Sequence, residues 1–325
     1  MNQVLHLLTG PTASGKSSAA VVLAQLMNAE IVSIDSMAIY RGMDIGTAKP
    51  PPPIRNLVPH HLIDIVAPSE TFSVAQFISL ARKTIADIRA RGRAPLLVGG
   101  TPMYIRALLS GLFEGPAADW ALRRELHEVA DSPEHGPLEL HAKLAQADPD
   151  AARRLHPHDV KRVVRALEVH AKIGKPISQL QRQWKSETPF GESVHLLALS
   201  RNSDDLRRRI NQRVDEMFER GLVDEVMRLL QRPGGLGRTA RAAVGYAETI
   251  QYIKGILPLA ETIDSVKKRT WRVARKQLTW LRHFPGVTWV EMTPEETPQN
   301  VGEALYKLVE NWHNHAPVMG LGTAH

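Results

Sequence analysis

Residues 10–17 read GPTASGKS and match the pattern G-x-x-x-x-G-K-[ST]. In such a loop the glycines let backbone N–H groups converge on a phosphate, and the lysine, here Lys16, adds a positive charge. The hydroxyl of Ser17 can ligate Mg²⁺. We therefore predict a phosphate-binding loop that consists of Gly10, Thr12, Ala13, Ser14, Gly15, Lys16 and Ser17.

The segments around this loop predict the elements that position it. Residues 4–9 are apolar and predict a buried strand, and apolar side chains recur at helical spacing directly after the loop. Further strands are predicted at 30–34, 95–98 and 194–199, with a helix over 73–91. Strands that alternate with helices form a parallel sheet. The predicted fold class is α/β, a P-loop NTPase-like parallel sheet flanked by helices, with a mostly helical insert.

The insert interrupts the sheet. Residues 113–189 have helical periodicity and no convincing strand, and a strand resumes after them. We expect a core from residues 1–112 and 190–313, an inserted domain at 113–189 and a disordered tail at 314–325. The core after the insert is expected to be helical over 205–220, 222–230 and 263–284.

A carboxylate and a hydroxyl follow two of the predicted strands. The strand at 95–98 ends in Gly-Gly-Thr, without the metal-binding Asp that ATP hydrolases place on a later strand. Asp35 instead follows the strand at 30–34. Because the carboxyl ends of parallel strands converge on the ligand crevice, Asp35, Thr101 and the loop are predicted to meet at one site. A base beside a diphosphate clamp suits group transfer better than hydrolysis. The simpler alternative is that Asp35 only caps the following turn.

Composition and charge limit the class of protein. The chain has 325 residues, 43% of them hydrophobic, and no cysteine, which excludes disulfides, cysteine-based metal sites and thiol nucleophiles. No apolar stretch is long enough to span a bilayer and no secretory signal is visible, so we expect a cytoplasmic protein. Residues 151–185 and 265–283 each carry a net charge of +7. Such concentrated charge favours a polyanionic partner, although solvated helix surfaces would look the same.

Eight sequence blocks, in order, resemble the bacterial tRNA dimethylallyltransferases, also called tRNA isopentenyltransferases. They are GPTASGKS (10–17), DSMAIYRGMDIGTAKP (35–50), PHHLIDI (59–65), LLVGGTPMYIRALLSGL (96–112), LHPHDVKRVVRALEV (155–169), RRRINQRVDEM (207–217), AVGYAE (243–248) and ARKQLTWLR (274–282). The resemblance extends from Val4 to about Arg282. It departs from the family pattern at Ala247, where relatives often have Lys or Arg, which puts a tRNA contact there in doubt.

The resemblance implies that a dimethylallyl group is transferred from dimethylallyl diphosphate to N6 of the adenosine 3′-adjacent to the tRNA anticodon, with release of diphosphate. It implies that the loop binds this diphosphate rather than ATP, that Arg213 clamps it, that Asp35 accepts the N6 proton and that Thr101 helps to hold the amine. The implied tRNA-binding residues are Asp35, Ser36, Met37, Ala38, Thr101, Arg123, Lys161, Arg162, Val163, Val164 and Arg165. We expect Mg²⁺ as cofactor, the anticodon stem-loop and dimethylallyl diphosphate as partners, no membrane, and a monomer.

Three alternatives stay open on the residues alone. A small-molecule P-loop kinase also places an Asp after its second strand, and a prenyltransferase of free adenine nucleotides would use the same loop. The basic insert and the basic helix near the C-terminus argue against both, since a small acceptor needs neither. A non-catalytic nucleic-acid-binding protein would not need the pair Asp35 and Thr101.

Overall fold

The computed structural model describes residues 4–111, 115–134, 136–182 and 193–315. The chain divides into two compact units. Residues 1–106 and 192–325 form the first, named here the core unit, and residues 107–191 form the second, the insert unit. The range predicted for the inserted domain, 113–189, lies within the insert unit. Residues 316–325 of the predicted tail lie outside the described residues.

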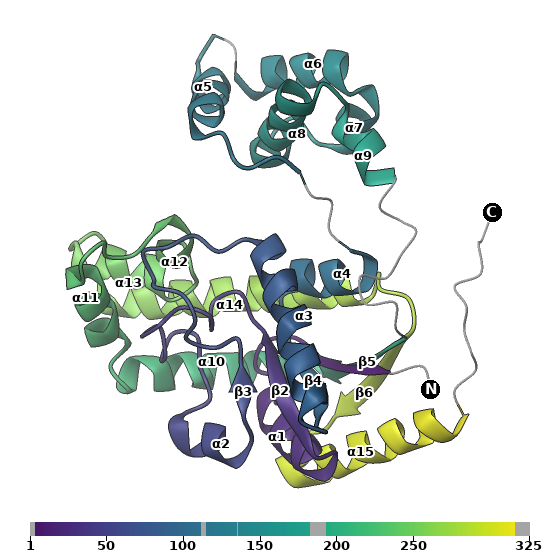
Figure 1. The fold of residues 1–325 in the computed structure, drawn as a ribbon. Helices are drawn as coiled ribbons and strands as arrows, with labels where there is room; N and C mark the ends of the chain where they lie inside the picture. Colours follow the sequence, from purple (N-terminus) through teal and green to yellow (C-terminus); the bar gives the residue numbers. More distant parts are fainter. Residues whose placement is uncertain (1–3, 112–114, 135, 183–192, 316–325) are drawn as a thin grey trace. The chain divides into compact units, whose positions relative to one another are not determined.

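The described part of the core unit contains a six-stranded sheet with the order β3-β2-β4-β1-β5-β6, and each neighbouring pair is parallel (Figure 1). The strands are β1 (Leu5–Thr9), β2 (Ala29–Ile34), β3 (His60–His61), β4 (Ala94–Gly99), β5 (Val194–Arg201) and β6 (Val287–Met292). The predicted fold class is confirmed. The four predicted strands form the centre of the sheet, whereas the two edge strands, β3 and β6, were not predicted.

Both faces of the sheet are buried. Leu8, Val98 and Leu197 pack with residues of α1 (Lys16–Leu26) and α15 (Pro298–His315) on one face. Their neighbours in sequence point to the other face and are equally buried. This explains why the central strands read as continuous apolar runs rather than as alternating patterns. The two helices approach closely at Gly302, where a Cβ atom would lie 2.5 Å from the Cβ of Val22.

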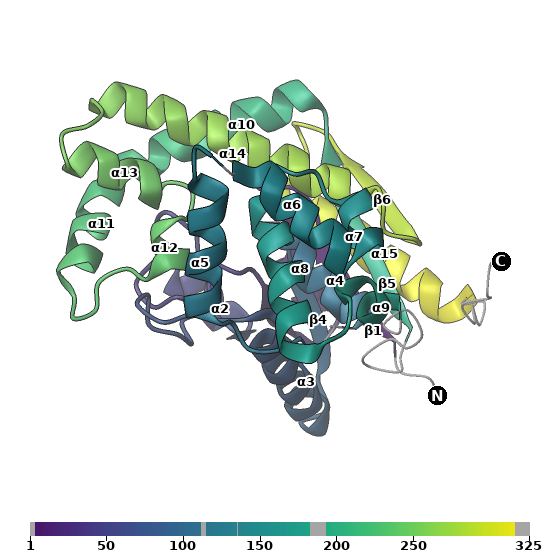
Figure 2. The same cartoon turned by 90° about the horizontal axis from the view of Figure 1, so that it is seen from above.

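The other helices of the core unit include the two that border the candidate site, α10 (Ser203–Glu219) and α14 (Leu259–Leu281). These two helices pack against each other through Leu206, Ile210 and Ala274 (Figures 1 and 2). The core helices are α2 (Pro52–Leu57), α3 (Val74–Ala90), α4 (Pro102–Ser110), which continues into the insert unit, α10 (Ser203–Glu219), α11 (Leu222–Gln231), α12 (Arg238–Arg241), α13 (Tyr246–Ile253) and α14 (Leu259–Leu281). Within the described residues, no helix is both long enough and apolar enough to span a membrane.

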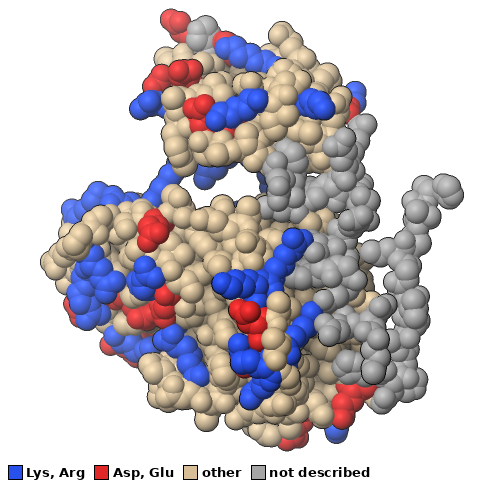
Figure 3. All heavy atoms as spheres, in the orientation of Figure 1, with Lys and Arg blue, Asp and Glu red and all other residues tan. Residues whose placement is uncertain are grey.

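In residues 115–134 and 136–182 the insert unit consists of helices and the short turns that connect them, and no strand is found there. Its helices are α5 (Trp120–Asp131), α6 (Gly136–Ala147), α7 (Pro149–Arg154), α8 (Val160–Ile173) and α9 (Ile177–Arg182). Leu140 and Leu144 of α6 and Val163 and Val169 of α8 form its hydrophobic core. On the face shown in Figure 3, Lys and Arg side chains of this unit lie beside Asp and Glu side chains.

A buried carboxylate organises one side of the insert unit. Glu168 is fully buried, and its two oxygens accept hydrogen bonds from Nε and Nη2 of Arg123, both at 2.8 Å. Arg165 and the backbone N–H of Asp119 donate to the same carboxylate. Burial raises the pKa of Glu168, but these hydrogen bonds outweigh it and hold the pKa below its usual value. The carboxylate therefore stays charged and ties α5 to α8.

Replacement of Glu168 with Ala should destabilise the protein by about 3–5 kcal/mol, because Arg123 and Arg165 lose their shared counter-charge. Chemical unfolding followed by circular dichroism would measure this change in the free energy of unfolding. The matched control is Glu139→Ala, which removes a carboxylate from a partly exposed ion pair with Lys143 and should cost at most about 1 kcal/mol. Equal losses in the two variants would contradict the role given to Glu168.

Candidate active site

The predicted phosphate loop connects β1 to α1 at the carboxyl end of the sheet. The loop reverses direction through positive φ angles of 145° at Gly10, 64° at Ala13 and 96° at Gly15. At Gly10 no side chain fits, because a Cβ atom would lie 2.8 Å from the carbonyl oxygen of Leu199. Lys16 folds back over the loop and its Nζ donates to the carbonyl oxygen of Pro11 at 3.2 Å. The loop and the first turn of α1 thus present N–H groups and an ammonium to one space.

Asp35 follows β2, and Thr101 follows the neighbouring strand β4. Both side chains hydrogen-bond the turn that begins at Asp35. Oδ1 of Asp35 accepts hydrogen bonds from the N–H groups of Met37 at 2.8 Å and Ala38 at 3.2 Å. The hydroxyl of Thr101 accepts from the N–H of Ser36 at 3.0 Å and also donates to the Ser36 hydroxyl. Asp35 therefore does cap its turn, as the simpler alternative proposed. Only one oxygen is used, and Oδ2 accepts no hydrogen bond from the part of the chain that the structure describes.

Two cations face this carboxylate. Burial, and then the charge of Arg213, lower the pKa of Lys16 to about 8, while the charge of Asp35 opposes this shift. Burial likewise lowers the pKa of Arg213, and Asp35 and Glu216 oppose that shift. Lys16, Arg213 and Asp35 therefore act on one another electrostatically. Glu216 does not line the cavity described below, whereas Lys16, Arg213 and Asp35 do, so the two half-buried cations face this space with one carboxylate and suit a ligand with several negative charges.

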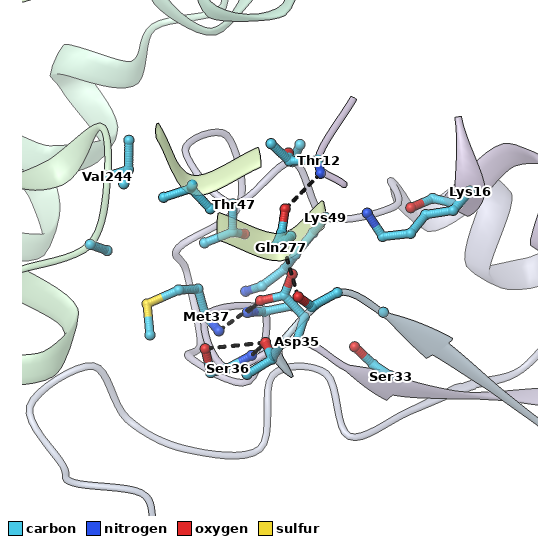
Figure 4. Close-up of a pocket in the computed structure, with 18 of the residues that line it drawn as sticks. Thr12, Lys16, Ser33, Asp35, Ser36, Met37, Thr47, Lys49, Val244 and Gln277 are labelled. Atoms are coloured by element: carbon cyan, nitrogen blue, oxygen red, sulfur yellow. Dashed lines mark hydrogen bonds between the residues drawn. The ribbon is translucent and has the colours of Figure 1, made fainter. Parts of the chain in front are cut away.

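These groups line one cavity of about 580 Å³, a size usual for a small-molecule site (Figure 4). All of its lining residues belong to the core unit. The sequence-predicted residues that line it are Thr12, Lys16, Ser17, Asp35, Ser36, Met37, Ala38, Thr101 and Arg213. The predicted convergence of the loop with the ends of β2 and β4 is thus present in the structure.

Two family models match this chain. The model described as IPP transferase matches residues 38–284, and the model described as isopentenyl transferase matches residues 3–56. The first match covers more than half of the chain. The chain belongs to the IPP transferase family.

Relatives of this IPP transferase support the same assignment. The chain is 46% identical to the tRNA dimethylallyltransferase of Geobacter sulfurreducens over 288 residues, which covers 88% of this chain and 91% of the relative. Among solved structures, it resembles the tRNA isopentenylpyrophosphate transferase of Bacillus halodurans with a TM-score of 0.69 and 39% identity, over 96% of each chain. A eukaryotic dimethylallyltransferase acting on tRNA matches with a TM-score of 0.81 and 27% identity, over 98% of this chain and 81% of that one. The family resemblance predicted from the sequence is confirmed.

Gln277 lines the cavity and was not predicted as a site residue. It lies on α14, the helix that carries the second basic segment. Its Oε1 accepts a hydrogen bond from the N–H of Thr12 at 2.9 Å, and its Nε2 donates to the carbonyl oxygen of Gly100 at 2.8 Å (Figure 4). A Cβ at Gly100 would lie 2.7 Å from this Nε2. Gln277 therefore joins the phosphate loop to the segment that carries Thr101. Gln277 lies in the block ARKQLTWLR, which resembles the family, but helical periodicity does not indicate that this residue belongs to the site.

A second unpredicted group, Glu225 of α11, holds the loop that follows the Asp35 turn. Its buried carboxylate accepts hydrogen bonds from the N–H groups of residues 44, 45 and 46, at 3.0, 2.7 and 3.2 Å, and from the hydroxyl of Tyr246 at 2.6 Å. Burial and the nearby carboxylate raise the pKa of Tyr246. Gly46 packs so closely on this ring that a Cβ would lie 2.5 Å from it. This contact fixes the loop whose Thr47 and Lys49 line the cavity.

The structure separates the six tRNA contacts predicted in the insert unit into three pairs. The side chains of Val163 and Val164 are 0% and 2% exposed and form part of the hydrophobic core, so they are not accessible to an RNA. Arg123 and Arg165 bind Glu168, as described above. Lys161 and Arg162 are exposed on α8. The tRNA-binding role of these residues stays a prediction, and Lys161 and Arg162 are the two whose charge is most open to solvent.

The pKa of about 8 at Lys16 predicts a pH dependence for anion binding. Lys16 carries its positive charge below this pKa and loses it above, so affinity for inorganic diphosphate should weaken as the pH rises from about 8 to about 9.5. Calorimetric titrations across this range would measure the change. In Lys16→Arg the guanidinium stays charged, and only the titration of the ligand itself should remain. Identical pH profiles in the two proteins would contradict the assignment to Lys16.

Proposed function

We propose that this chain transfers the dimethylallyl group of dimethylallyl diphosphate to N6 of the adenosine 3′-adjacent to the anticodon of tRNA. The observation that carries the proposal is the shared cavity, in which a phosphate loop faces a carboxylate that is not part of that loop. The reaction needs such a pair, because one group must bind the departing diphosphate and another must accept the proton of the amine. Membership of the IPP transferase family supports this choice of donor and acceptor.

The leaving group departs at the loop end of the cavity. The bond between the allylic carbon and the diphosphate oxygen breaks, and the developing negative charge is met by the loop N–H groups, Lys16 and Arg213. These cations are already in place and partly desolvated, so little reorganisation is needed when charge appears on the oxygen. The allylic carbon can carry positive charge because that charge is delocalised.

The new bond forms between N6 of the adenosine and the same allylic carbon. An exocyclic adenine amine is a weak nucleophile, because its lone pair is drawn into the ring. Asp35 can take the N6 proton on Oδ2 while its Oδ1 stays bound to the N–H groups of Met37 and Ala38. A general base of this kind contributes about 10²–10⁴ in rate. Thr101, fixed by its hydrogen bonds to Ser36, lies beside this carboxylate and helps to hold the amine.

The adenosine has to leave its stack in the tRNA to reach this cavity. Enzymes that modify a base commonly extrude it into a pocket, where water is excluded and the base is held by its edges. The cavity is lined by Met37, Ala38 and Val244 as well as by polar groups, so an adenine would meet apolar surface on its way to Asp35. The strong negative charge of the tRNA backbone would be met by exposed cations such as Lys161 and Arg162.

The site fits Mg²⁺ as a partner of the diphosphate rather than as a resident metal. Ser17 offers a hydroxyl at the start of α1, and it lines the cavity beside Lys16. No group of three or more acidic, His or Cys residues that could hold a metal occurs among the described residues. Mg²⁺ is often bound by one protein oxygen together with substrate phosphates and water. Ser17 would then hold the ion, which would supply further charge neutralisation of the leaving diphosphate.

The alternatives differ in the acceptor. A kinase would transfer phosphate to a small hydroxyl compound, and a prenyltransferase of free nucleotides would need no RNA-binding surface. Neither accounts for a separate helical unit with exposed cations at Lys161 and Arg162. The monomeric state and the cytoplasmic location stay predictions.

Asp35→Asn should reduce the rate of prenyl transfer by at least about 10² while tRNA affinity stays within about twofold. The amide can still accept hydrogen bonds from the turn, but it cannot take up a proton at neutral pH. Single-turnover transfer to unmodified tRNA and filter binding would measure the two quantities. Ser33→Ala, which removes a polar group from the same cavity without touching the turn, is the matched control. Unchanged turnover in Asp35→Asn would remove Asp35 from the reaction.

Joint replacement of Lys161 and Arg162 by Ala should weaken tRNA affinity and flatten its dependence on salt concentration, because two counterion-releasing contacts are lost. Arg165 is left intact, since its loss would expose Glu168 and disturb folding. The measurement is binding of unmodified tRNA at several salt concentrations. Lys83 and Lys307, both exposed on helices of the core unit, provide a control pair for the same change in net charge. An unaltered salt slope in the α8 variant would exclude these residues as phosphate contacts.

A further inference from the structure

The outer side of the phosphate loop has partners that the site description above does not include. For loop N–H groups to point at an anion, the carbonyl groups between them must point away from it, and they then need donors of their own. The Nε of Arg201 donates to the carbonyl oxygen of Ser14 at 2.9 Å. The Nε of Arg209 donates to the carbonyl oxygen of Ala13 at 3.0 Å. Two arginines thus bind two consecutive carbonyl groups at the tip of the loop.

Arg201 is held rigidly. It ends β5, the strand next to β1, and its side chain is only 2% exposed. Its Nη1 donates to Oδ2 of Asp205 at 2.8 Å and to the carbonyl oxygen of Thr293 at 2.9 Å. The carboxylate of Asp205 is itself buried and also accepts from Arg208. Because Asp205 lies on α10 and Thr293 directly follows β6, the guanidinium is held in place by partners outside the loop.

Arg209 lies one helical turn before Arg213 on α10. Residues four apart share a face of a helix. On this face of α10, Arg209 binds the outer side of the loop and Arg213 lines the cavity. The carbonyl oxygen that Arg209 holds belongs to Ala13, which has a left-handed φ of 64°. A non-glycine residue in this conformation is strained and needs support from its surroundings.

We propose that Arg201 and Arg209 are positioning residues that keep the loop in its diphosphate-binding shape before substrate arrives. By fixing the carbonyl groups of Ser14 and Ala13, they align the N–H groups on the opposite side of the same peptide segment. Less ordering then remains to be done when the diphosphate binds, which raises affinity for it. This inference rests on the proposed function, in which the ligand of the loop is the diphosphate of an allylic donor.

The test uses Arg209→Met in the full chain, because Arg209 is less buried than Arg201 and its loss is less of a risk to folding. Calorimetric titration with inorganic diphosphate should show a dissociation constant about tenfold higher, as expected for one lost charged hydrogen bond. The KM for dimethylallyl diphosphate should rise by a similar factor, and the KM for tRNA should not change. Arg209→Lys keeps a cationic donor and should recover part of the affinity.

The matched control is Arg220→Met, which removes the same charge from an exposed position at the C-terminal end of α10, outside the network of Arg201, Asp205 and Arg208. It should bind diphosphate within about twofold of the wild-type protein. If Arg209→Met binds diphosphate as tightly as the wild type, or if only its melting temperature falls, the positioning role is wrong. If the wild-type protein itself binds no diphosphate, the proposed function fails instead, and the two failures are thereby distinguished.

Discussion

The site depends on keeping two cations, Lys16 and Arg213, close together in a partly desolvated space with Asp35 as the nearby carboxylate. Like charges repel more strongly when water is removed, so this arrangement costs free energy in the absence of a ligand. It persists because each cation is carried by a different rigid element, Lys16 by α1 and Arg213 by α10. A ligand with several negative charges would remove this repulsion, as the diphosphate of the proposed donor would.

The rest of the core unit holds these charges in place. The parallel sheet brings the ends of β1, β2 and β4 to one edge, where the loop, Asp35 and Thr101 follow. Gln277 of α14 then joins the loop to Gly100, and Glu225 of α11 fixes the segment at residues 44–46. Helices that are distant in sequence thus supply the contacts that set the width of the cavity. The loop and the Asp35 turn, which we propose to serve the leaving group and the acceptor amine, thus follow separate strands and are joined by these few hydrogen bonds.

The loop, the central strands and the meeting of Asp35 with Thr101 could be predicted because they are local patterns or follow from the topology of a parallel sheet. The edge strands could not. β3 has two residues, and β6 contains the exposed Trp289, so neither has a continuous apolar run. Gln277, Glu225 and Arg201 were missed because each acts on a segment more than 170 positions away in the sequence. Val163 and Val164 of the insert unit were predicted as tRNA contacts from the family resemblance. Their place on the apolar stripe of α8 instead puts their side chains in the hydrophobic core.

We propose that a nucleotide-type loop serves an isoprenoid leaving group and that the acceptor is an adenosine in tRNA. The most direct measurement supplies the purified protein and Mg²⁺ with dimethylallyl diphosphate labelled in the prenyl group, together with unmodified tRNA, AMP or ATP as acceptor. We expect label on N6 of one tRNA adenosine, release of diphosphate in equal amount, and no label on AMP or ATP. Label on free nucleotides with none on tRNA, or consumption of ATP while the prenyl donor stays intact, would contradict it.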